Sequence, residues 1–223
     1  MCGRFTLTAD SATVQEALDL GNMPAELEPR YNVAPTQPVA IVTEPDEREV
    51  KLFRWGLIPS WAKDIKIGYR LINARAETVA QKPAFRAAFS RRRCIVLADG
   101  FYEWQRVGKK KKQPYYFRLA SGQPFAMAGL WEVWRRSKEA EPLYTCTIIT
   151  CAANERVAPI HHRSPVILDA EKPWVWLDPD ASREQLRDLL MPLPAEQIDL
   201  YPVSPLVNSP RNDLPSLVEP IVV

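Results

Sequence analysis

The chain begins Met-Cys-Gly-Arg-Phe, which places a cysteine at the second position. A chain end is normally frayed, whereas core packing, a disulfide or a metal site each need a position inside a folded element. If the initiating Met1 is removed, however, Cys2 carries a free α-amine and a thiol on adjacent carbon atoms. Two nucleophiles then lie side by side, a use that exists nowhere else in a chain. Cys2 is therefore a candidate nucleophile.

Titratable candidates occur in an expected strand and in a loop, where functional side chains often lie. Glu103 stands between aromatic residues in Phe-Tyr-Glu-Trp. If Glu103 faces a cleft, desolvation raises its pKa toward neutrality and suits it to proton transfer; if it faces solvent, it is an ordinary strand residue. His161 and His162 are the two histidines of the chain. Since adjacent residues of an extended segment point apart, at most one of them is expected to act.

Asparagine, tryptophan and arginine side chains complete the set of candidates. Asn73 and Arg75 end an expected strand in Ile-Asn-Ala-Arg, although Asn73 could instead cap the helix expected after it. Trp61 and Arg86 could form a surface that stacks bases and holds phosphates, or they could equally be packing and rim residues. The sequence contains no glycine-rich phosphate loop, nucleophile elbow or zinc-protease motif.

The composition excludes a uniformly basic surface. Lys and Arg total 29 against 27 Asp and Glu, a formal charge of +2, so affinity for nucleic acid must come from local patches. The runs Arg91–Arg93 and Lys109–Lys112 are interpreted as solvated charge, the second as a hairpin tip. No run of about 18 apolar residues could cross a membrane, and no apolar leader follows Met1, so a cytoplasmic protein without a membrane partner is expected.

The other three cysteines are interpreted as small buried residues. A cytosolic chain keeps them reduced. Cys146 and Cys151 lie in one expected strand, at a spacing that points them to opposite faces, and Cys94 lies in another. No C-x-x-C pair is present and the histidines stand at no recognised zinc spacing, so neither a metal nor a cofactor is expected.

The elements that must position these residues are mostly short strands. Strands are expected at 38–43, 48–55, 69–75, 94–98, 100–107, 113–120, 123–134, 142–151 and 164–169. Helices are expected at 10–21, at 76–93 with a break at Pro83, and at 182–190, the first with Asp10 or Ser11 as N-cap. Strands without βαβ alternation predict an α+β fold with an antiparallel, barrel-like core and short helices. No linker divides the chain, so residues 1–223 are expected to form a single domain that ends in an extended tail at 209–223.

Eight segments in order carry a resemblance to a known family. They are MCGRF, RYNVAPTQ, WGLIPSWAKD, INARAET, DGFYEW, QPYYF, AGLWE and IHHRSPVIL. In this combination the sequence resembles the SRAP family, the SOS response-associated peptidase-like proteins, also called abasic site processing proteins. The resemblance covers residues 1–208. One departure is Ser164, which stands where the family motif often has methionine.

The resemblance implies a protein that crosslinks itself to abasic sites in single-stranded DNA during the DNA damage response. After loss of Met1, the cysteine would react with the sugar aldehyde and end as a thiazolidine ring. By motif position, Cys2 would be the nucleophile, Asn73 and Glu103 would act at the reacting centre, and His161 would shuttle protons.

The same resemblance implies how the DNA would be held. Arg4, Arg75 and Arg163 fall where the family contacts phosphates, and Trp61 falls where an aromatic residue supports the bases. With Arg86, these residues predict a basic stripe near Cys2 that grips a single strand without reading sequence and loses affinity as salt rises. A monomer is the default expectation.

Two other functions use the same residues. A cysteine peptidase would use Cys2 as a thiolate and His161 as base, with Asn73 or Glu103 to orient the imidazole. Its substrates could be other peptides or only its own Met1. A non-catalytic reader of single-stranded or modified DNA would use the same groove without a covalent step.

Overall fold

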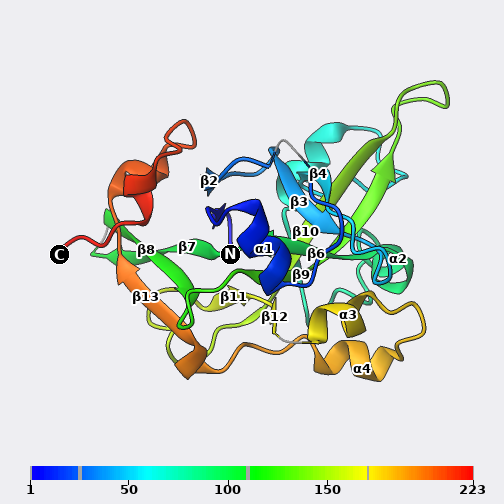
Figure 1. Cartoon of the computed structure of the whole chain (residues 1–223). Coiled ribbons are helices and arrows are strands. Elements are labelled where there is room, and N and C mark those ends of the chain that lie inside the picture. The colour runs from blue at the N-terminus through cyan, green and yellow to red at the C-terminus, as the bar shows by residue number, and fades with distance from the viewer. Residues whose placement is uncertain (1, 25–26, 109–110, 170, 223) are drawn as a thin grey trace.

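A closed β-barrel forms one half of the molecule. The computed structural model describes residues 2–24, 27–108, 111–169 and 171–222. Within it, five strands pair in the order β10-β4-β3-β6-β9, and β9 pairs back to β10, which closes the barrel (Figure 1). Their bounds are β3 (Pro38–Val42), β4 (Lys51–Trp55), β6 (Arg93–Ala98), β9 (Phe125–Trp134) and β10 (Leu143–Ala152). Four of these five pairings are antiparallel and β4–β10 is parallel.

Three short strands extend this barrel sheet. β5 (Asn73–Arg75) pairs in parallel with β10, and β11 (Arg163–Pro165) pairs with the end of the same strand. β12 (Ile167–Leu168) pairs with β9. Asn73 and Arg163 lie 90 positions apart in the sequence, but β5 and β11, which carry them, flank β10 on its two sides.

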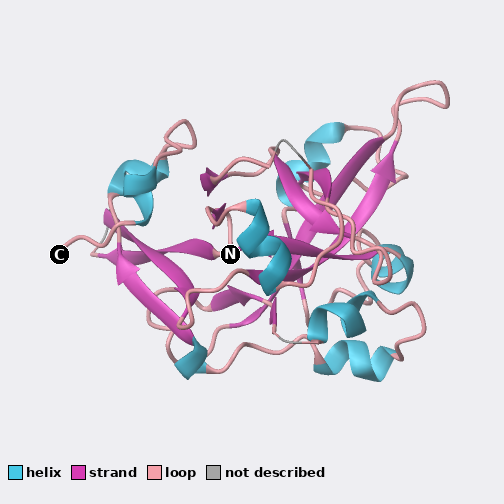
Figure 2. Ribbon diagram, viewed as in Figure 1, coloured by secondary structure: helices cyan, strands magenta, loops and turns pink. Residues whose placement is uncertain are grey.

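A second, wholly antiparallel sheet holds the start of the chain. Its strands follow the order β13-β8-β7-β1-β2 (Figure 2). The bounds are β1 (Phe5–Leu7), β2 (Arg30–Val33), β7 (Gly100–Val107), β8 (Lys111–Leu119) and β13 (Ile198–Pro202). β1 lies inside this sheet, between β2 and β7, so both of its edges are paired. The N-terminal segment is thereby fixed on the fold rather than left at an edge.

The helices are short and lie around the sheets. They are α1 (Ser11–Ala17), α2 (Arg86–Arg91), α3 (Lys172–Leu177) and α4 (Arg183–Asp188), with 3-10 helices η1 (Ile65–Arg70), η2 (Ala195–Gln197), η3 (Pro205–Asn208) and η4 (Pro215–Val218). The cap expected for the first helix is present, and α4 has a cap that was not predicted. Asp10 accepts a hydrogen bond from the Thr13 amide, and Ser182 forms a capping box with Gln185. The predicted α+β class with a barrel-like antiparallel core and short helices is confirmed.

Apolar side chains form two main clusters on opposite faces of the barrel strands. One cluster contains Cys151 and Trp176, and the other contains Cys146, Cys94 and Cys2. Residues 146 and 151 therefore point to opposite faces, and the interpretation of the three internal cysteines as small buried residues is confirmed. Cys2 belongs to the same cluster as the strands that close the barrel, so the chain terminus is part of the core.

Several local expectations were wrong. Residues 76–85 form turns, and the helix expected at 76–93 is reduced to α2, because Pro83 lacks an amide donor and the chain folds to bury Val79 and Phe85. The strand expected at 69–75 begins at Asn73, since η1 takes its first residues. β13 and α3 were missed; α3 is too short and too apolar to show a helical period.

Two further expectations concern the C-terminal tail and the lysine hairpin tip. The segment 209–223, expected as an extended tail, contains η4 and buries Leu217 completely. The expected lysine hairpin tip lies partly outside the described residues, as do Met1 and the question of its removal. Across the parts of the chain that are described, no helix is long and apolar enough to span a membrane.

Candidate active site

The N-terminal segment is pinned by one buried carboxylate. Asp99 accepts hydrogen bonds from the hydroxyl of Thr6 at 2.5 Å, from the amide and hydroxyl of Thr8 at 2.5 and 2.7 Å, and from the amide of Ala9 at 2.9 Å. Thr6 also contacts the hydroxyl of Tyr116 at 2.9 Å. With β1 paired on both edges, these bonds order a terminus that would otherwise fray. Position 2 is therefore a defined place in the fold.

Cys2 lies completely buried beside Asn73. Its carbonyl accepts a hydrogen bond of 2.7 Å from Nδ2 of Asn73, and its Sγ lies 3.8 Å from the Arg4 carbonyl. Burial and, to a smaller extent, the nearby charge of Glu103 raise the pKa of the Cys2 thiol to about 12. The thiol is therefore protonated at neutral pH and lies within electrostatic range of the Glu103 carboxyl.

The two polar atoms of the Asn73 side chain have different surroundings. Nδ2 bonds Cys2, whereas Oδ1 is buried and, among the described residues, has no hydrogen-bond donor. The residues that follow Asn73 form turns, and its side chain bonds Cys2, so the interpretation of Asn73 as a helix cap is wrong. A buried acceptor without a donor is costly, so a donor from a ligand or from a processed chain end would complete it.

Glu103 faces inward from β7. Its side chain is 3% exposed, which answers the question that the sequence left open between cleft and solvent. Burial raises the pKa of the Glu103 carboxyl. Its Oε1 lies 3.7 Å from Nδ1 of His161. A carboxyl with a raised pKa beside an imidazole is an arrangement suited to moving protons near neutral pH.

The two histidines have different surroundings. Nδ1 of His161 lies 3.0 Å from the amide nitrogen of Arg163 and 3.2 Å from its carbonyl oxygen, and it accepts from the first or donates to the second according to the tautomer of the ring. Burial lowers the pKa of His161, so the ring is neutral at pH 7. His162 is exposed and its ring lies 4.4 Å from that of His161. His161 is thus the histidine that borders Glu103 in the interior.

The structure brings together the four residues that the resemblance assigns to chemistry. Cys2 comes from the N-terminal segment, Asn73 from β5, Glu103 from β7, and His161 from the loop before β11. A hydrogen bond joins Cys2 and Asn73, charge couples Cys2 to Glu103, and a 3.7 Å contact joins Glu103 to His161. No group of three metal-ligating side chains occurs in the described ranges.

The five residues assigned to DNA contact have unequal surroundings. Trp61 is 60% exposed, and Arg75 and Arg86 are exposed. Arg4 is partly buried and donates from Nη1 to Asn32 and to a backbone carbonyl. Arg163 is 8% exposed and is engaged inside the protein: its guanidinium bonds both carboxylate oxygens of Glu77, at 2.5 and 3.0 Å, and a carbonyl of β10 at 2.5 Å.

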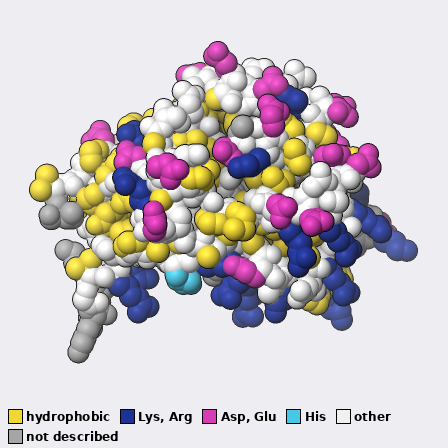
Figure 3. Space-filling view, turned by 90° about the horizontal axis from the view of Figure 1, so that it is seen from below, with side chains coloured by type: hydrophobic (Ala, Val, Ile, Leu, Met, Phe, Trp, Pro, Cys, Tyr) yellow, Lys and Arg dark blue, Asp and Glu magenta, His cyan; other side chains and the backbone are white. Residues whose placement is uncertain are grey.

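The surface near the histidines is basic. Figure 3 shows Lys and Arg side chains on both sides of the histidines along one border of that face. The exposed Lys112 and Arg106 lie on the β7–β8 hairpin, and the exposed Arg75 follows Asn73 on β5. Positive charge therefore gathers locally around the candidate centre even though the chain as a whole carries a formal charge of +2.

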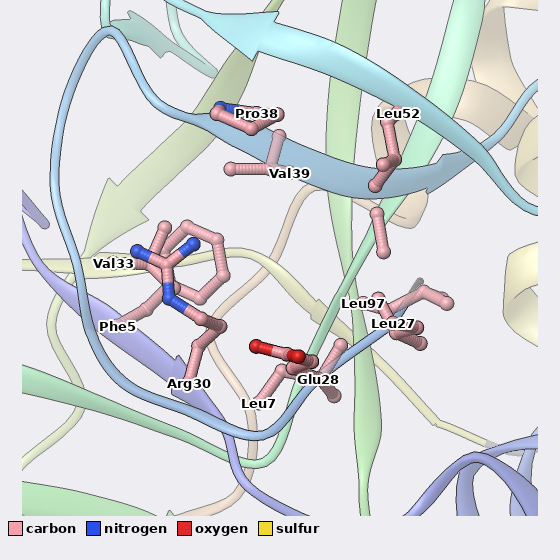
Figure 4. Close-up of a pocket in the computed structure, with 11 residues that line it drawn as sticks. Phe5, Leu7, Leu27, Glu28, Arg30, Val33, Pro38, Val39, Leu52 and Leu97 are labelled. Atoms are coloured by element: carbon pink, nitrogen blue, oxygen red, sulfur yellow. The ribbon is translucent and has the colours of Figure 1, made fainter. Parts of the chain in front are cut away.

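An apolar pocket in the structure is separate from this centre. It has a volume of about 140 Å³ and lies where β1 and β2 face β3 (Figure 4). Its walls are mainly aliphatic and include Leu7, Val39 and Leu97, with Glu28 and Arg30 as its charged residues. None of the residues assigned to chemistry or to DNA contact lines it, so the candidate reaction does not take place there.

Sequence reasoning missed three residues that shape the site. They are Asn32, which holds Arg4; Asp99, which pins β1; and Glu77, which neutralises Arg163. Asn32 and Asp99 stand within the segments RYNVAPTQ and DGFYEW, so the signal was their place beside the other motif residues. Their roles depend on partners about 30 to 180 positions away, which no local pattern indicates.

Comparison with known proteins agrees with this geometry. The family model of the SOS response associated peptidase (SRAP) matches residues 1–210. The chain is 47% identical to the abasic site processing protein YoqW of Bacillus subtilis over 223 residues, covering 98% of this chain and 99% of that protein. It is 34% identical to the abasic site processing protein HMCES of Gallus gallus, covering 99% of this chain and 78% of that protein.

Solved structures show the same fold. A crystal structure of a protein from Bacteroides thetaiotaomicron superposes with a TM-score of 0.88 at 30% identity, covering 99% of this chain and all of that one. A protein from Bordetella bronchiseptica gives a TM-score of 0.76 at 28% identity, covering 91% of this chain and all of that one. With a family model that spans nearly its whole length and relatives of this identity, the chain belongs to the SRAP family.

Proposed function

We propose that this protein processes abasic sites in single-stranded DNA by bonding covalently to them through Cys2 after removal of Met1. The observation that carries the proposal is the convergence of Cys2, Asn73, Glu103 and His161 in one largely buried place. The printed names of relatives at 47% and 34% identity, abasic site processing proteins, support the choice of lesion.

The first step would open the sugar. An abasic deoxyribose is mostly a closed hemiacetal, and opening it moves a proton from the 1-hydroxyl to the ring oxygen without net gain or loss. His161 is suited to this transfer because its neutral ring has one nitrogen that can donate a proton and one that can accept a proton. The product is a free aldehyde.

The amine would attack next. An α-amine has a pKa of about 7.7–8.0, so roughly a tenth or more of it is neutral at pH 7. Its nitrogen adds to the aldehyde carbon, and loss of water gives an imine. Glu103, whose pKa burial raises, can protonate the leaving hydroxyl. The open Oδ1 of Asn73 is an acceptor for an N–H of that amine, which would orient the nitrogen.

The thiol would close the ring. Sγ bonds the imine carbon, the second electron pair of the C=N bond moves to nitrogen, and the thiol proton passes to that nitrogen, for which Glu103 is the near carboxylate that can relay it. Because both nucleophiles belong to one residue, closure has an effective molarity of about 10⁵ M or more. The thiazolidine distinguishes this product from an open Schiff base, which can promote strand cleavage.

Burial of Cys2 sets a condition on this mechanism. In the 223-residue chain Cys2 is 0% exposed. Residue 1 is bonded to the Cys2 nitrogen, so its removal necessarily vacates space next to that nitrogen and turns an amide into an amine. The aldehyde is expected to enter on that side. If the processed chain, with Cys2 first, still fails to react with a small aldehyde such as glycolaldehyde, the proposal is wrong.

The two competing functions fit less well. A cysteine peptidase needs a thiolate, and thiolates arise where the pKa of the thiol is lowered, whereas burial and Glu103 raise the pKa of Cys2. A pure reader of DNA would explain the basic border but would have no use for a buried carboxyl beside an imidazole, whose burial costs stability.

An oligonucleotide with a single abasic site tests the proposal. The processed protein should form an adduct that survives heat and denaturant and that intact mass spectrometry shows as protein plus DNA minus one water. Cys2→Ala and retention of Met1 should abolish it. Cys2→Ser should allow an imine that borohydride traps but should give no stable ring. An undamaged oligonucleotide is the control. Cleavage of peptides without an adduct would support the peptidase instead.

A further inference from the structure

The guanidinium of Arg4 is held through one of its terminal nitrogen atoms. Nη1 donates to Oδ1 of Asn32 at 2.7 Å and to the Val207 carbonyl at 2.8 Å. In the described parts of the chain, Nε is buried and meets no acceptor, whereas Nη2 makes no hydrogen bond and is not enclosed. Burial lowers the pKa of Arg4, the Tyr102 hydroxyl opposes that effect, and no Asp or Glu of the described residues pairs with the guanidinium. A half-buried cation without a counter-charge is costly, so an anion is the partner that would complete it.

Asn32 joins this arginine to the C-terminal part of the chain. The Asn32 side chain is completely buried, and its Nδ2 donates to the carbonyls of Asn212 at 2.6 Å and Ser209 at 3.0 Å, with that of Val207 at 3.3 Å. These carbonyls belong to residues 204–213, which we call the arm. One amide thus uses its oxygen on Arg4 and its nitrogen on the arm, and neither group is free to move alone.

The arm also contacts Trp104 of β7, beside the candidate site. Asn208 accepts a 2.7 Å hydrogen bond from Nε1 of Trp104, the neighbour of Glu103 in β7, and the guanidinium of Arg4 lies 6.0 Å from the Trp104 ring. At its far end the arm is tied down by Asp213, which accepts from Nε of Arg30 and from the Tyr31 amide, both at 2.6 Å. The arm is therefore held at both ends against the site.

We infer that Asn32 is a positioning residue for DNA binding and that the arm is the scaffold through which it acts: together they hold Arg4 so that its second terminal guanidinium nitrogen, Nη2, faces a backbone phosphate. The inference rests on the proposed function for its partner, single-stranded DNA. A planar guanidinium held through Nη1 presents the donors of Nη2 in a fixed orientation, which matches the geometry of a phosphate.

The residue type supports this role. An aspartate at position 32 would hold Arg4 equally well, but it would neutralise the charge that a phosphate needs and would turn a negative oxygen toward the arm carbonyls. The neutral amide holds Arg4 and keeps its charge. Arg163 shows the contrast, because its partner Glu77 is a carboxylate.

Binding of undamaged single-stranded DNA tests the inference. Anisotropy of a fluorescent oligonucleotide, measured over a series of salt concentrations, should show Asn32→Ala weakening affinity about tenfold, as expected for a lost charge-assisted phosphate contact. The plot of log affinity against log salt should flatten by about 0.7 for one lost contact on a single strand. The double variant with Arg4→Ala should bind like Arg4→Ala alone, because Asn32 acts through Arg4. An unchanged slope, or additive losses, would overturn the inference.

A second pair of variants covers the case in which Asn32→Ala does not fold. Asp213→Ala releases the far end of the arm without touching Arg4 or Trp104, and about a threefold loss of affinity is expected because the guanidinium loses orientation but keeps its charge. Glu219→Ala is the matched control, since it removes the same charge from an exposed residue beyond the arm. Equal affinities for these two variants would overturn the inference.

The adduct assay separates the inference from the proposed function. Wild-type protein that binds the undamaged strand with the expected variant effects, yet forms no adduct with abasic DNA, would leave the role of the arm standing and remove the crosslinking reaction. Wild-type protein that does not bind single-stranded DNA would remove the inference itself.

Discussion

The candidate centre and its basic border place charged groups in opposite surroundings. In the centre, burial raises the pKa of Glu103 and of the Cys2 thiol and lowers that of His161, so each group is biased toward its neutral form. At the border, Arg75, Arg106 and Lys112 are exposed. Under the proposed function the two regions have separate roles: the centre would move protons, and the border would attract phosphates.

Arg4 and Arg163 lie between these two regions and differ from each other. Both are partly or fully buried, but Arg163 is matched by the Glu77 carboxylate, whereas Arg4 is held by neutral oxygen atoms. The resemblance assigns both to phosphate contact. Their surroundings predict that Arg4 contributes to DNA binding and that Arg163 contributes to stability and to the placement of His161, whose Nδ1 lies 3.0 Å from the Arg163 amide nitrogen.

The largest expected effect separates the centre from the border. Glu103→Gln keeps the shape of the side chain but removes its proton-transfer capacity, so the single-turnover rate of adduct formation should fall about a hundredfold. Affinity for undamaged single-stranded DNA should stay unchanged, and Val107→Thr, at an exposed position of the same strand, serves as the control for disturbance of β7. A parallel loss of DNA affinity would break the comparison, because Glu103 would then act in binding.

Stability is the next largest effect, and it concerns Arg163. Arg163→Ala removes the bonds to Glu77 and to the Thr150 carbonyl from a buried place, so the free energy of unfolding should fall by about 2 kcal/mol, less than for a fully buried pair because Glu77 is half exposed. Urea unfolding measures this change. In the matched variant Arg4→Ala, the free energy of DNA binding should change more than the free energy of unfolding. The reverse pattern would contradict the assignment of the two arginines.

The pH dependence of stability follows from Glu103. Its folded pKa lies above its unfolded value, so the folded state binds more protons and stability falls as pH rises through the folded pKa. Glu103→Gln removes this loss. The variant should therefore gain melting temperature relative to wild type at pH 8 and little or nothing at pH 4, as thermal unfolding at the two pH values would show. An equal gain at both would mean that the carboxyl is not the group responsible.

The smallest effect sharpens the contrast between the arginines. Glu77→Gln leaves Arg163 without its neutralising partner, so affinity for single-stranded DNA at low salt should rise about twofold as local positive potential increases. Glu155→Gln, on an exposed residue of another loop, is the control for net charge. If both variants raise affinity equally, the gain belongs to total charge and not to Arg163.

Local sequence signals predicted a substantial part of the fold. The N-cap Asp10 of α1 was predicted because the capping residue stands directly beside its helix. The barrel strands were legible from apolar patterning, and the opposite faces of Cys146 and Cys151 from the two-residue period of a strand. The helix predicted for residues 76–85 from their composition was wrong, because burial of two apolar side chains favoured turns over a helix.

The sequence by itself determined which residue types are present for chemistry: a cysteine at position 2, a carboxyl among aromatics, a histidine pair, and motifs typical of one family. The tertiary structure alone decided that Glu103 faces inward, that His161 is the half-buried histidine beside it, and that Nη2 of Arg4 has no partner among the described residues whereas both terminal nitrogens of Arg163 are bonded. The reason is physical. A pKa and a free hydrogen-bonding edge depend on burial and on partners brought from distant strands, and the Arg4 contact to Val207 spans 203 positions.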